Sequence, residues 1–299
     1  MSFKLSKQKK LNNKLPIAKI IGGVNDKKYL YLSDHTYNLK DCPADILNKI
    51  SIKEKQILDN SLKTGLEPED ENLTKIFYDC KEFIKKKNCK FILRDKGKLE
   101  YVPSTKFIER VLVAGISGSG KSTWSSKYIK NYLKQNKKNP FYVLSNVDED
   151  DIIDKLDPVR LDLVDLAENG IDIDDIENSI MLLDDVDTIE NTAVRKAIKS
   201  FQNNMLECSR HYNTTLVITQ HHLQNGWASK TTLNEANIIV LFMKSNARAI
   251  KNYLKTYLCW EHDQIIRLLN LNSRFAMIYQ GLDTNFPPFV LYEKGCYVL

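Results

Sequence analysis

From Phe107 onward, short apolar runs alternate with amphipathic helical segments. Each run is apolar on both faces, which is typical of buried parallel strands. The alternation indicates βαβ units, and so predicts an α/β core over residues 105–299 with a mostly parallel sheet flanked by helices. The predicted core strands are VLVAG (111–115), FYVLS (141–145), IMLLD (180–184), TLVIT (215–219) and NIIVLFM (237–243), with FAMIY (275–279) and FVLYE (289–293) as a strand pair added at one edge.

Residues 15–104 have a mixed pattern, which predicts a small α+β accessory domain. PIAKIIG and KYLYLS indicate two strands joined through the turn-rich segment GVNDK, and KFIL and KLEYV around DKGK indicate a second hairpin. Residues 44–63 and 73–87 carry apolar side chains at helical spacing. This region shows no chemical constellation, so its purpose stays open.

The first fourteen residues, MSFKLSKQKKLNNK, hold five lysines and no acidic residue. We expect a disordered basic tail over residues 1–14. No apolar run follows that would serve as the core of a signal peptide, and no stretch of the chain is apolar enough to predict a membrane span.

With 299 residues, of which 42% are hydrophobic, the chain is long enough for about two domains. The 44 Lys and Arg exceed the 38 Asp and Glu and give a net charge of +6, which is compatible with a polyanionic partner but assigns no function by itself. The six cysteines are scattered without zinc-site spacing, so we expect reduced thiols in a cytosolic protein.

The segment GISGSGKS matches the phosphate-binding pattern G-x-x-x-x-G-K-[ST], between an apolar strand and the helical segment TWSSKYIKNYLKQ. Its glycines let backbone N–H groups face the phosphates, and the positive end of the helix adds to the attraction. Lys121 is expected to reach the β and γ phosphates, and Ser122 to bind Mg²⁺. The pattern therefore predicts that ATP with magnesium binds along Gly115, Ile116, Ser117, Gly118, Ser119, Gly120, Lys121, Ser122 and Thr123.

The apolar run IMLLD ends in two adjacent acids, Asp184 and Asp185. ATPases place a Mg²⁺-binding carboxylate and a water-orienting group at such strand ends. We expect Asp184 to hold Mg²⁺, directly or through water, and Asp185 to orient and polarise the attacking water. The alternative is a helix N-cap followed by a solvated turn, since Asp187 and Thr188 continue the polar stretch.

Two further residues are candidates for catalysis. Gln220 closes the next predicted strand and would sense the γ phosphate there, although a polar residue at a strand end can also be a simple loop start. Arg210 lies in ECSRHYNTT, between a predicted helix (192–207) and that strand. It is either an arginine finger acting on a neighbouring subunit or a charge at a helix end. His221 and His222 have no acid or Cys at ligand spacing, so neither is assigned to a metal.

The order of GISGSGKST, SIMLLDDVD and SRHYNTTLVITQH resembles the genome-packaging ATPases of large double-stranded DNA viruses, the poxvirus-like branch of the FtsK and HerA superfamily of P-loop ATPases. The likeness spans roughly residues 107–293. It implies a homo-oligomeric ring, a pentamer or hexamer, that uses ATP and Mg²⁺ to thread double-stranded DNA into a preformed viral capsid, in the host cell cytoplasm (virus factory) or the virion. Asp185 departs from the Glu that cellular translocases usually have. The residues implied are Lys121 and Ser122 for nucleotide and Mg²⁺, Asp184 and Asp185 for hydrolysis, Gln220 as sensor and Arg210 as finger.

Three other functions stay open: a cellular-type FtsK or HerA translocase or helicase, a P-loop nucleotide kinase, and an ATP-gated structural adaptor. The basic-poor stretch from Asp148 to Asp187 disfavours a kinase, which is expected to have an Arg-rich lid. The adjacent acids Asp184 and Asp185 disfavour an adaptor without turnover. The basic segment 244–255 either contacts DNA phosphates or forms the solvated face of an amphipathic helix, and the pattern favours the helix face.

Overall fold

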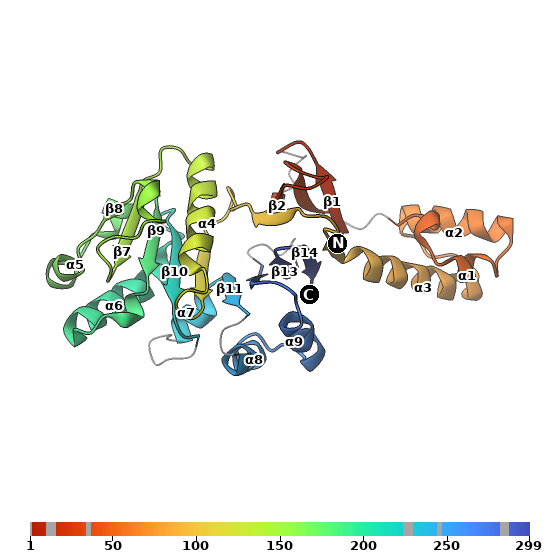
Figure 1. The fold of residues 1–299 in the computed structure, drawn as a ribbon. Helices are drawn as coiled ribbons and strands as arrows, with labels where there is room; N and C mark the ends of the chain where they lie inside the picture. The colour runs from red at the N-terminus through yellow and green to blue at the C-terminus, as the bar shows by residue number, and fades with distance from the viewer. Residues whose placement is uncertain (1, 10–15, 34–36, 224–229, 244–246, 282–286) are drawn as a thin grey trace. The chain divides into compact units, whose positions relative to one another are not determined.

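The computed structural model describes residues 2–9, 16–33, 37–223, 230–243, 247–281 and 287–299 (Figure 1). Its contacts divide the chain into two compact units, Met1–Lys98 with Gly295–Val298, and Leu99–Lys294 with Leu299. This division differs from the expected domain ranges at both ends of the second unit. Among the described helices, none is both long and apolar enough to cross a bilayer.

The second unit is built on a sheet with the strand order β13-β12-β11-β6-β10-β9-β7-β8. The strands from β11 to β8 pair in parallel, and β12 and β13 are added antiparallel at the β11 edge. The predicted α/β class, with a mostly parallel sheet and an antiparallel strand pair at one edge, is confirmed. The strands are β6 (Arg110–Ala114), β7 (Phe141–Ser145), β8 (Val159–Arg160), β9 (Ile180–Asp184), β10 (Thr215–Gln220), β11 (Ile238–Phe242), β12 (Phe275–Tyr279) and β13 (Phe289–Tyr292).

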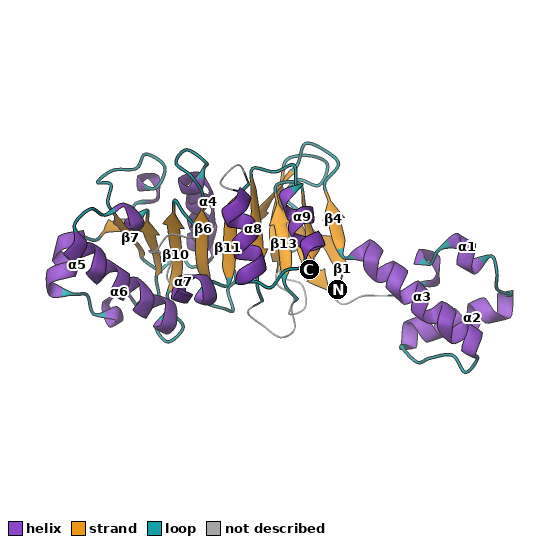
Figure 2. Cartoon of the chain, turned by 90° about the horizontal axis from the view of Figure 1, so that it is seen from below, coloured by secondary structure: helices purple, strands orange, loops and turns teal. Residues whose placement is uncertain are grey.

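Helices cover both faces of this sheet, which is why its central strands are apolar on both sides. In Figure 2, α4 lies behind the sheet, whereas α6, α7, α8 and α9 lie in front of it. The strands β6, β9, β10 and β11 are buried along their whole length. The helices of this unit are α4 (Lys121–Gln135), α5 (Leu163–Asn169), α6 (Thr192–Cys208), α7 (Lys230–Glu235), α8 (Ala247–Thr256) and α9 (His262–Leu269).

The position of β10 determines where the chemistry-bearing residues lie. This strand follows β9 in the sequence, yet it is hydrogen-bonded between β9 and β6. In register, Gln220 lies opposite Ala114 of β6, and Ile218 lies opposite Leu183 of β9. Because all three strands are parallel, their carboxyl ends meet at one edge of the sheet.

A buried carboxyl group connects α4 to the strand β6. Glu109, which is 1% exposed, accepts hydrogen bonds from the hydroxyls of Tyr101 and Tyr128 and from the backbone N–H of Ser104. Burial raises the pKa of Glu109 to about 7, although these three donors act to lower it. The group therefore titrates close to neutral pH.

The first unit contains a small antiparallel sheet in the order β1-β3-β2, with β1 (Ser2–Ser6), β2 (Pro16–Ile21) and β3 (Tyr29–Ser33). The predicted hairpin of β2 and β3 is confirmed. Three helices follow, α1 (Ala44–Leu47), α2 (Ile52–Thr64) and α3 (Glu71–Asn88). The predicted helix over residues 44–63 is broken because Ser51 caps α2 in a capping box with Glu54.

Two expectations for this unit are wrong. Residues 2–6 are not a disordered tail but the strand β1, because Phe3 and Leu5 alternate with Lys4 and every residue of the strand has a partner on β3. Residues 1 and 10–14 of the expected tail lie outside the described residues. The second predicted hairpin is also wrong, since β4 (Lys90–Ile92) pairs antiparallel with β14 (Gly295–Val298) and not with β5 (Lys98–Tyr101). A partner so distant in sequence leaves no local signal.

Candidate functional site

The glycines of the phosphate-binding loop occupy positions that favour glycine, either by backbone conformation or by lack of space. Gly118 and Gly120 have φ values of 71° and 111°, in the left-handed region that favours glycine. A Cβ on Gly115 would lie 2.7 Å from the Ser119 hydroxyl and 2.9 Å from the Cβ of Phe242. The loop therefore needs glycine for its own conformation, as expected for a backbone that wraps a phosphate.

The loop leads directly into α4, whose first residue is Lys121. The lysine is only 6% exposed, and its ammonium donates to the Gly115 carbonyl over 3.1 Å and pairs with Asp185 at 3.3 Å. Ser122 is half-buried and Thr123 is exposed in the first turn of the helix. Helix N-terminus and ammonium together give the loop a positive field, which attracts phosphate.

Asp184, the last residue of β9, is 8% exposed and accepts a hydrogen bond from the Thr219 hydroxyl at 2.8 Å. Burial raises its pKa, and the charges of Asp185 and Asp150 raise it further, whereas the Thr219 hydrogen bond and the Lys121 charge lower it. A divalent cation would offset this penalty on the ionised form. The oxygen donors of Asp184 and Ser122 are the ligand type that Mg²⁺ prefers, so the donor set fits that ion.

Asp185 is held on several sides. Its backbone N–H donates to the Thr219 hydroxyl at 2.8 Å, and one carboxylate oxygen lies 3.3 Å from the Lys121 ammonium and 3.2 Å from Nε2 of His221. Its backbone is left-handed, with φ 46° and ψ 34°. Although Asp185 precedes the short 3-10 turn Val186–Thr188, its side chain makes no capping hydrogen bond. The N-cap alternative therefore does not describe what this carboxylate does.

His221 lies beside acids that are distant in the sequence. Its backbone N–H donates to Asp187 at 3.2 Å, and ligand atoms of His221, Asp185 and Asp187 lie within 4.8 Å of one another. The sequence shows no acid at ligand spacing from this histidine, and Asp185 and Asp187 reach it because the parallel strands bring the two segments together. The Lys121 ammonium already pairs with Asp185, which disfavours a further cation in this cluster.

Thr219, a residue that the sequence did not single out, contacts both acids. It is in register with Asp184, one position beyond the Ile218–Leu183 pair. Side chains alternate along a strand, so Gln220 points to the other face of the sheet. Gln220 is 1% exposed, and within the described part of the chain its amide group has no hydrogen-bond partner. The backbone carbonyl of Gln220 accepts a hydrogen bond from the Gly115 N–H at 3.1 Å. The role of Gln220 as a γ-phosphate sensor stays a prediction.

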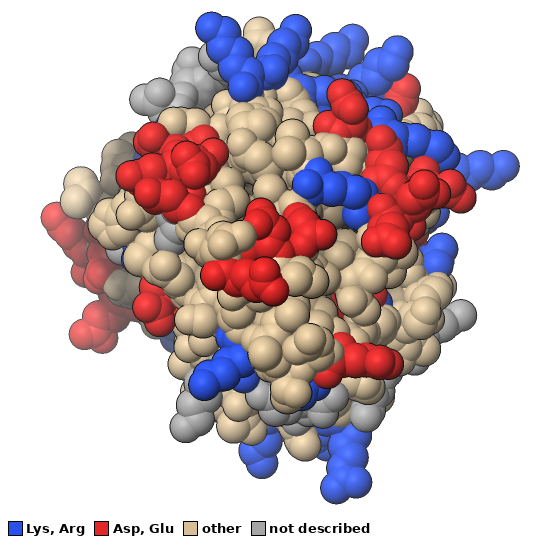
Figure 3. All heavy atoms as spheres, turned by 90° about the vertical axis from the view of Figure 1, so that its left-hand side faces the viewer, with Lys and Arg blue, Asp and Glu red and all other residues tan. Residues whose placement is uncertain are grey.

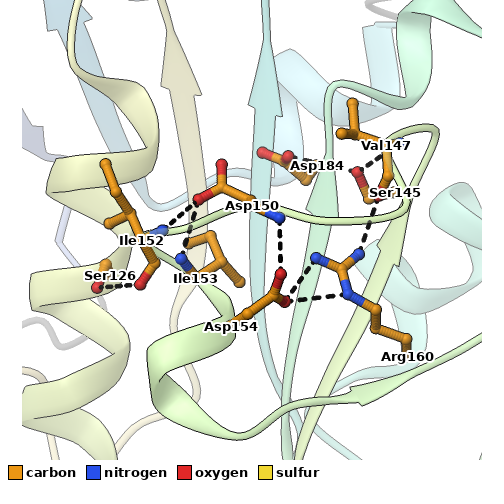
Figure 4. Close-up of polar contacts among 9 residues, drawn as sticks. All are labelled: Ser126, Ser145, Val147, Asp150, Ile152, Ile153, Asp154, Arg160 and Asp184. Atoms are coloured by element: carbon orange, nitrogen blue, oxygen red, sulfur yellow. Dashed lines mark hydrogen bonds and ion pairs between the residues drawn. The ribbon is translucent and has the colours of Figure 1, made fainter.

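The loop after β7 adds a third acid near Asp184 (Figure 4). Asp150 accepts hydrogen bonds from the backbone N–H groups of Ile152 and Ile153, at 2.8 and 3.0 Å. Its own N–H donates to Asp154, which also pairs with Arg160 at 2.6 Å. These contacts fix the loop, so the negative charge of Asp150 remains beside the Asp184 carboxylate.

Arg210 is not brought to these residues. It lies exposed in the turn after α6. Burial lowers the pKa of Arg110, the first residue of β6, the Glu235 carboxylate raises it, and the nearby charge of Arg210 lowers it. Arg210 therefore lies at the amino end of β6, whereas the phosphate-binding loop follows its carboxyl end. Within one chain the two are at opposite edges of the sheet.

Comparison with curated proteins finds a relative of this chain. The uncharacterized protein V3 of Sputnik virophage is 36% identical over 217 residues, which make up 69% of this chain and 86% of that protein. No model of a known protein family matches the chain.

Two kinds of solved structure are similar at low identity. The genome packaging NTPase B204 of Sulfolobus turreted icosahedral virus 2, in complex with AMPPCP, is 11% identical with a TM-score of 0.42, and the match covers 62% of this chain and 97% of that one. The pCW3 conjugation coupling protein TcpA with ATPγS is 13% identical with a TM-score of 0.45, over 94% of this chain and 77% of that one. Scores this low carry no residue from those structures to this chain.

Proposed function

The chain belongs to the same family as protein V3 of Sputnik virophage, and we propose that it is an ATPase that translocates double-stranded DNA to package a viral genome. The observation that carries the ATPase part is the meeting of Lys121 and Asp185, 3.3 Å apart at the carboxyl edge of the parallel sheet. Ligands of open α/β sheets bind outside this edge.

Nucleotide binding follows from the loop and its charge. Backbone N–H groups of the loop and the ammonium of Lys121 would provide donors for the phosphates, except the N–H of Ser119, which donates to the Ile116 carbonyl at 3.1 Å. Mg²⁺, held by Ser122 and Asp184, would neutralise charge that develops on the phosphates. The chain itself supplies the positions of these oxygens, through the start of α4 and the end of β9.

Hydrolysis needs a group that accepts a proton from water, and Asp185 is our candidate. The Thr219 hydroxyl donates to its carboxylate at 3.0 Å, and the Lys121 ammonium and Nε2 of His221 lie within 3.3 Å of its other oxygen. When Lys121 contacts a phosphate, that contact competes with the ion pair, so phosphate binding would release the carboxylate for the water. This coupling makes the acid available when a substrate is present.

The DNA part of the proposal rests on the motif order and is constrained by surface charge. The face in Figure 3, which carries α5, gathers acidic side chains. The loop after β7, the N-cap of α5 and α5 itself carry exposed acidic residues, namely Asp148, Glu149, Asp151, Asp162, Asp165 and Glu168. Such a surface repels phosphate, so DNA would contact other faces. The exposed cations of α8, Arg248, Lys251 and Lys255, are candidates, while residues 244–246 of that basic segment lie outside the described residues.

The remaining parts of the proposal concern assembly. A finger role for Arg210 requires a second subunit, because the residue is far from the loop of its own chain. We therefore propose a homo-oligomeric ring that acts on a viral capsid. Since the relative is a virophage protein, we expect the site of action to be the cytoplasm of an infected cell or the virion.

The test is ATP hydrolysis by the full chain with and without linear double-stranded DNA. We expect Mg²⁺-dependent phosphate release that DNA stimulates, and none from Lys121→Ala. DNA affinity should fall with salt, with a log-log slope of about −0.9 per phosphate contact. Hydrolysis that single-stranded but not double-stranded DNA stimulates would favour a helicase. ATP turnover that neither single-stranded nor double-stranded DNA changes would refute translocation. Normal turnover by a folded Lys121→Ala variant would refute the assignment of the phosphate-binding site.

A further inference from the structure

Arg274 is a cation beside the phosphate-binding loop that neither the motifs nor the resemblance assign. Its guanidinium Nη2 donates to the carbonyl of Ser119 over 3.2 Å. The residue directly precedes β12, and its carbonyl accepts from the Met243 N–H at 3.0 Å. Since β12 pairs with β11 along its length, the backbone of Arg274 is fixed beside the loop by the sheet.

The same guanidinium lies against the last glycine of the loop. A Cβ on Gly120 would be 3.5 Å from Nη2 of Arg274 and 3.4 Å from the ring of Phe242. Both side chains therefore border the loop on one side, at the point where α4 begins. Gly120 has φ 111°, so this close approach coincides with a backbone that only glycine adopts readily.

The electrostatics of this position point to an anion. Arg274 is exposed, and within the described ranges no carboxylate lies at ion-pair distance from its guanidinium. It stands at the N-terminus of α4, where the helix dipole is positive, and near Lys121. Lys121 is paired with Asp185 at 3.3 Å, and the Glu293 carboxylate accepts from the backbone N–H of Arg274 at 3.5 Å, so the Arg274 guanidinium is the charge at this end of the loop that a phosphate can pair with.

The strand order indicates which part of a nucleotide lies there. The Lys121 side chain extends toward Asp185, on the β10 and β9 side of the loop. We therefore expect the γ phosphate to bind on that side. The other neighbour of β6 is β11, followed by β12. A nucleotide that lies along the loop with its γ phosphate at Asp185 extends its α phosphate and nucleoside toward β11 and β12, where Arg274 stands.

We propose that Arg274 binds the α-phosphate end of the nucleotide within its own subunit, with its planar fork on the phosphate oxygens. This inference rests on the proposed ATPase function. It assigns Arg274 to binding of the ground state, in contrast to Arg210, which is a candidate for transition-state stabilisation from a neighbouring subunit.

The experiment compares Arg274→Ala, Arg274→Lys and the control Lys134→Ala, an exposed cation in the last turn of α4, at the far end of that helix from the loop. Binding of fluorescent ADP and steady-state ATP hydrolysis are measured on the full chain, with thermal melting to verify folding. Because one charge-assisted contact is lost, we expect ADP affinity to fall and KM for ATP to rise by about tenfold in Arg274→Ala, with kcat within about threefold. Arg274→Lys should recover part of the affinity, and Lys134→Ala should match wild type.

The outcomes separate this inference from the proposed function. If wild type and Arg274→Ala bind ADP equally well, the assignment of Arg274 is overturned and the proposed ATPase function stands. A large loss of kcat with unchanged ADP binding also overturns it, because the residue would then act on the γ phosphate. Wild-type chain that binds neither ADP nor ATP would refute both.

Discussion

The ammonium of Lys121 lies 3.3 Å from the carboxylate of Asp185. The sequence assigned the lysine to phosphate binding and the acid to water activation, as separate steps. Their contact couples phosphate binding to water activation, because a phosphate that attracts the Lys121 ammonium weakens its ion pair with Asp185. Replacing either residue therefore changes the environment of the other, and the variants below are chosen with this coupling in mind.

Asp185→Asn should keep nucleotide binding and lose hydrolysis, because an amide cannot accept a proton from the attacking water. We expect turnover to fall by roughly 10² to 10⁴, the usual range for a lost general base. ADP affinity should stay equal or rise, since Lys121 loses a competing carboxylate. Fluorescent ADP binding and phosphate release measure the two effects separately.

Asp148→Asn is the matched control, because Asp148 is exposed in the loop after β7. It should behave as wild type. If Asp185→Asn loses binding and turnover together, Asp185 has a structural role.

Thr219→Val should slow hydrolysis, because Thr219 is the residue that contacts both acids. Valine keeps the shape but leaves the Asp185 N–H without its acceptor, at a cost of about 1–3 kcal/mol in stability. It also removes the hydrogen bond that lowers the pKa of Asp184. Thr219→Ser retains the hydroxyl, so its turnover and melting temperature should stay near wild type. Equal turnover of the Val and Ser variants would contradict this role.

Glu109→Gln should remove a pH dependence of stability. Burial raises the pKa of Glu109 to about 7 from 4.5, so folding favours the protonated form. The stability this provides is complete below about pH 4.5 and is lost as pH rises through 7. Relative to the Gln variant, wild type should lose roughly 3 kcal/mol between pH 4.5 and 8, since each unit is worth about 1.36 kcal/mol.

Urea unfolding at the two pH values measures this difference, and other groups cancel between the two proteins. Glu168→Gln, at an exposed position of α5, is the control and should follow wild type at both pH values. A constant difference between wild type and Glu109→Gln would show that Glu109 does not titrate in this range.

Arg210→Ala should bind ATP normally and hydrolyse it poorly, because a finger acts on the transition state, where it is worth ~10³–10⁵ in rate. Lys121→Ala alone should be inactive. Mixed rings contain interfaces that combine the intact loop of one variant with the intact Arg210 of the other, so mixing should restore part of the activity. Full turnover by Arg210→Ala in the presence of DNA would make the residue a helix-end charge.

The predicted core strands and the loop were readable from the sequence because their signals are local. The runs 141–145 and 180–184 coincide with the parallel strands β7 and β9, and the run 275–279 coincides with the antiparallel strand β12, since a strand buried on both faces is a continuous apolar run. The G-x-x-x-x-G-K-S pattern is also contiguous in the sequence, so it predicts the phosphate-binding loop without any distant partner. Fold class and nucleotide loop therefore followed directly.

Other features depend on partners far along the chain. Thr219 and His221 meet Asp185 only because β10 inserts between β6 and β9, and Arg274 reaches Ser119 only through the pairing of β11 with β12. The pairing of β4 with β14 likewise joins two segments that are far apart in the sequence. Periodicity gives the elements, but it does not give the strand order that brings these side chains together.

The left-handed backbone of Asp185 limits which acid can stand there. At φ 46° most side chains are strained, while Asp and Asn are among the few non-glycine residues that adopt this region readily. Glutamate, the residue usual in cellular translocases, would carry a conformational penalty at this point. The backbone at this position therefore favours the shorter acid over the longer one. A descendant of this protein could adopt the longer acid only after the turn at residues 185–188 had changed its path.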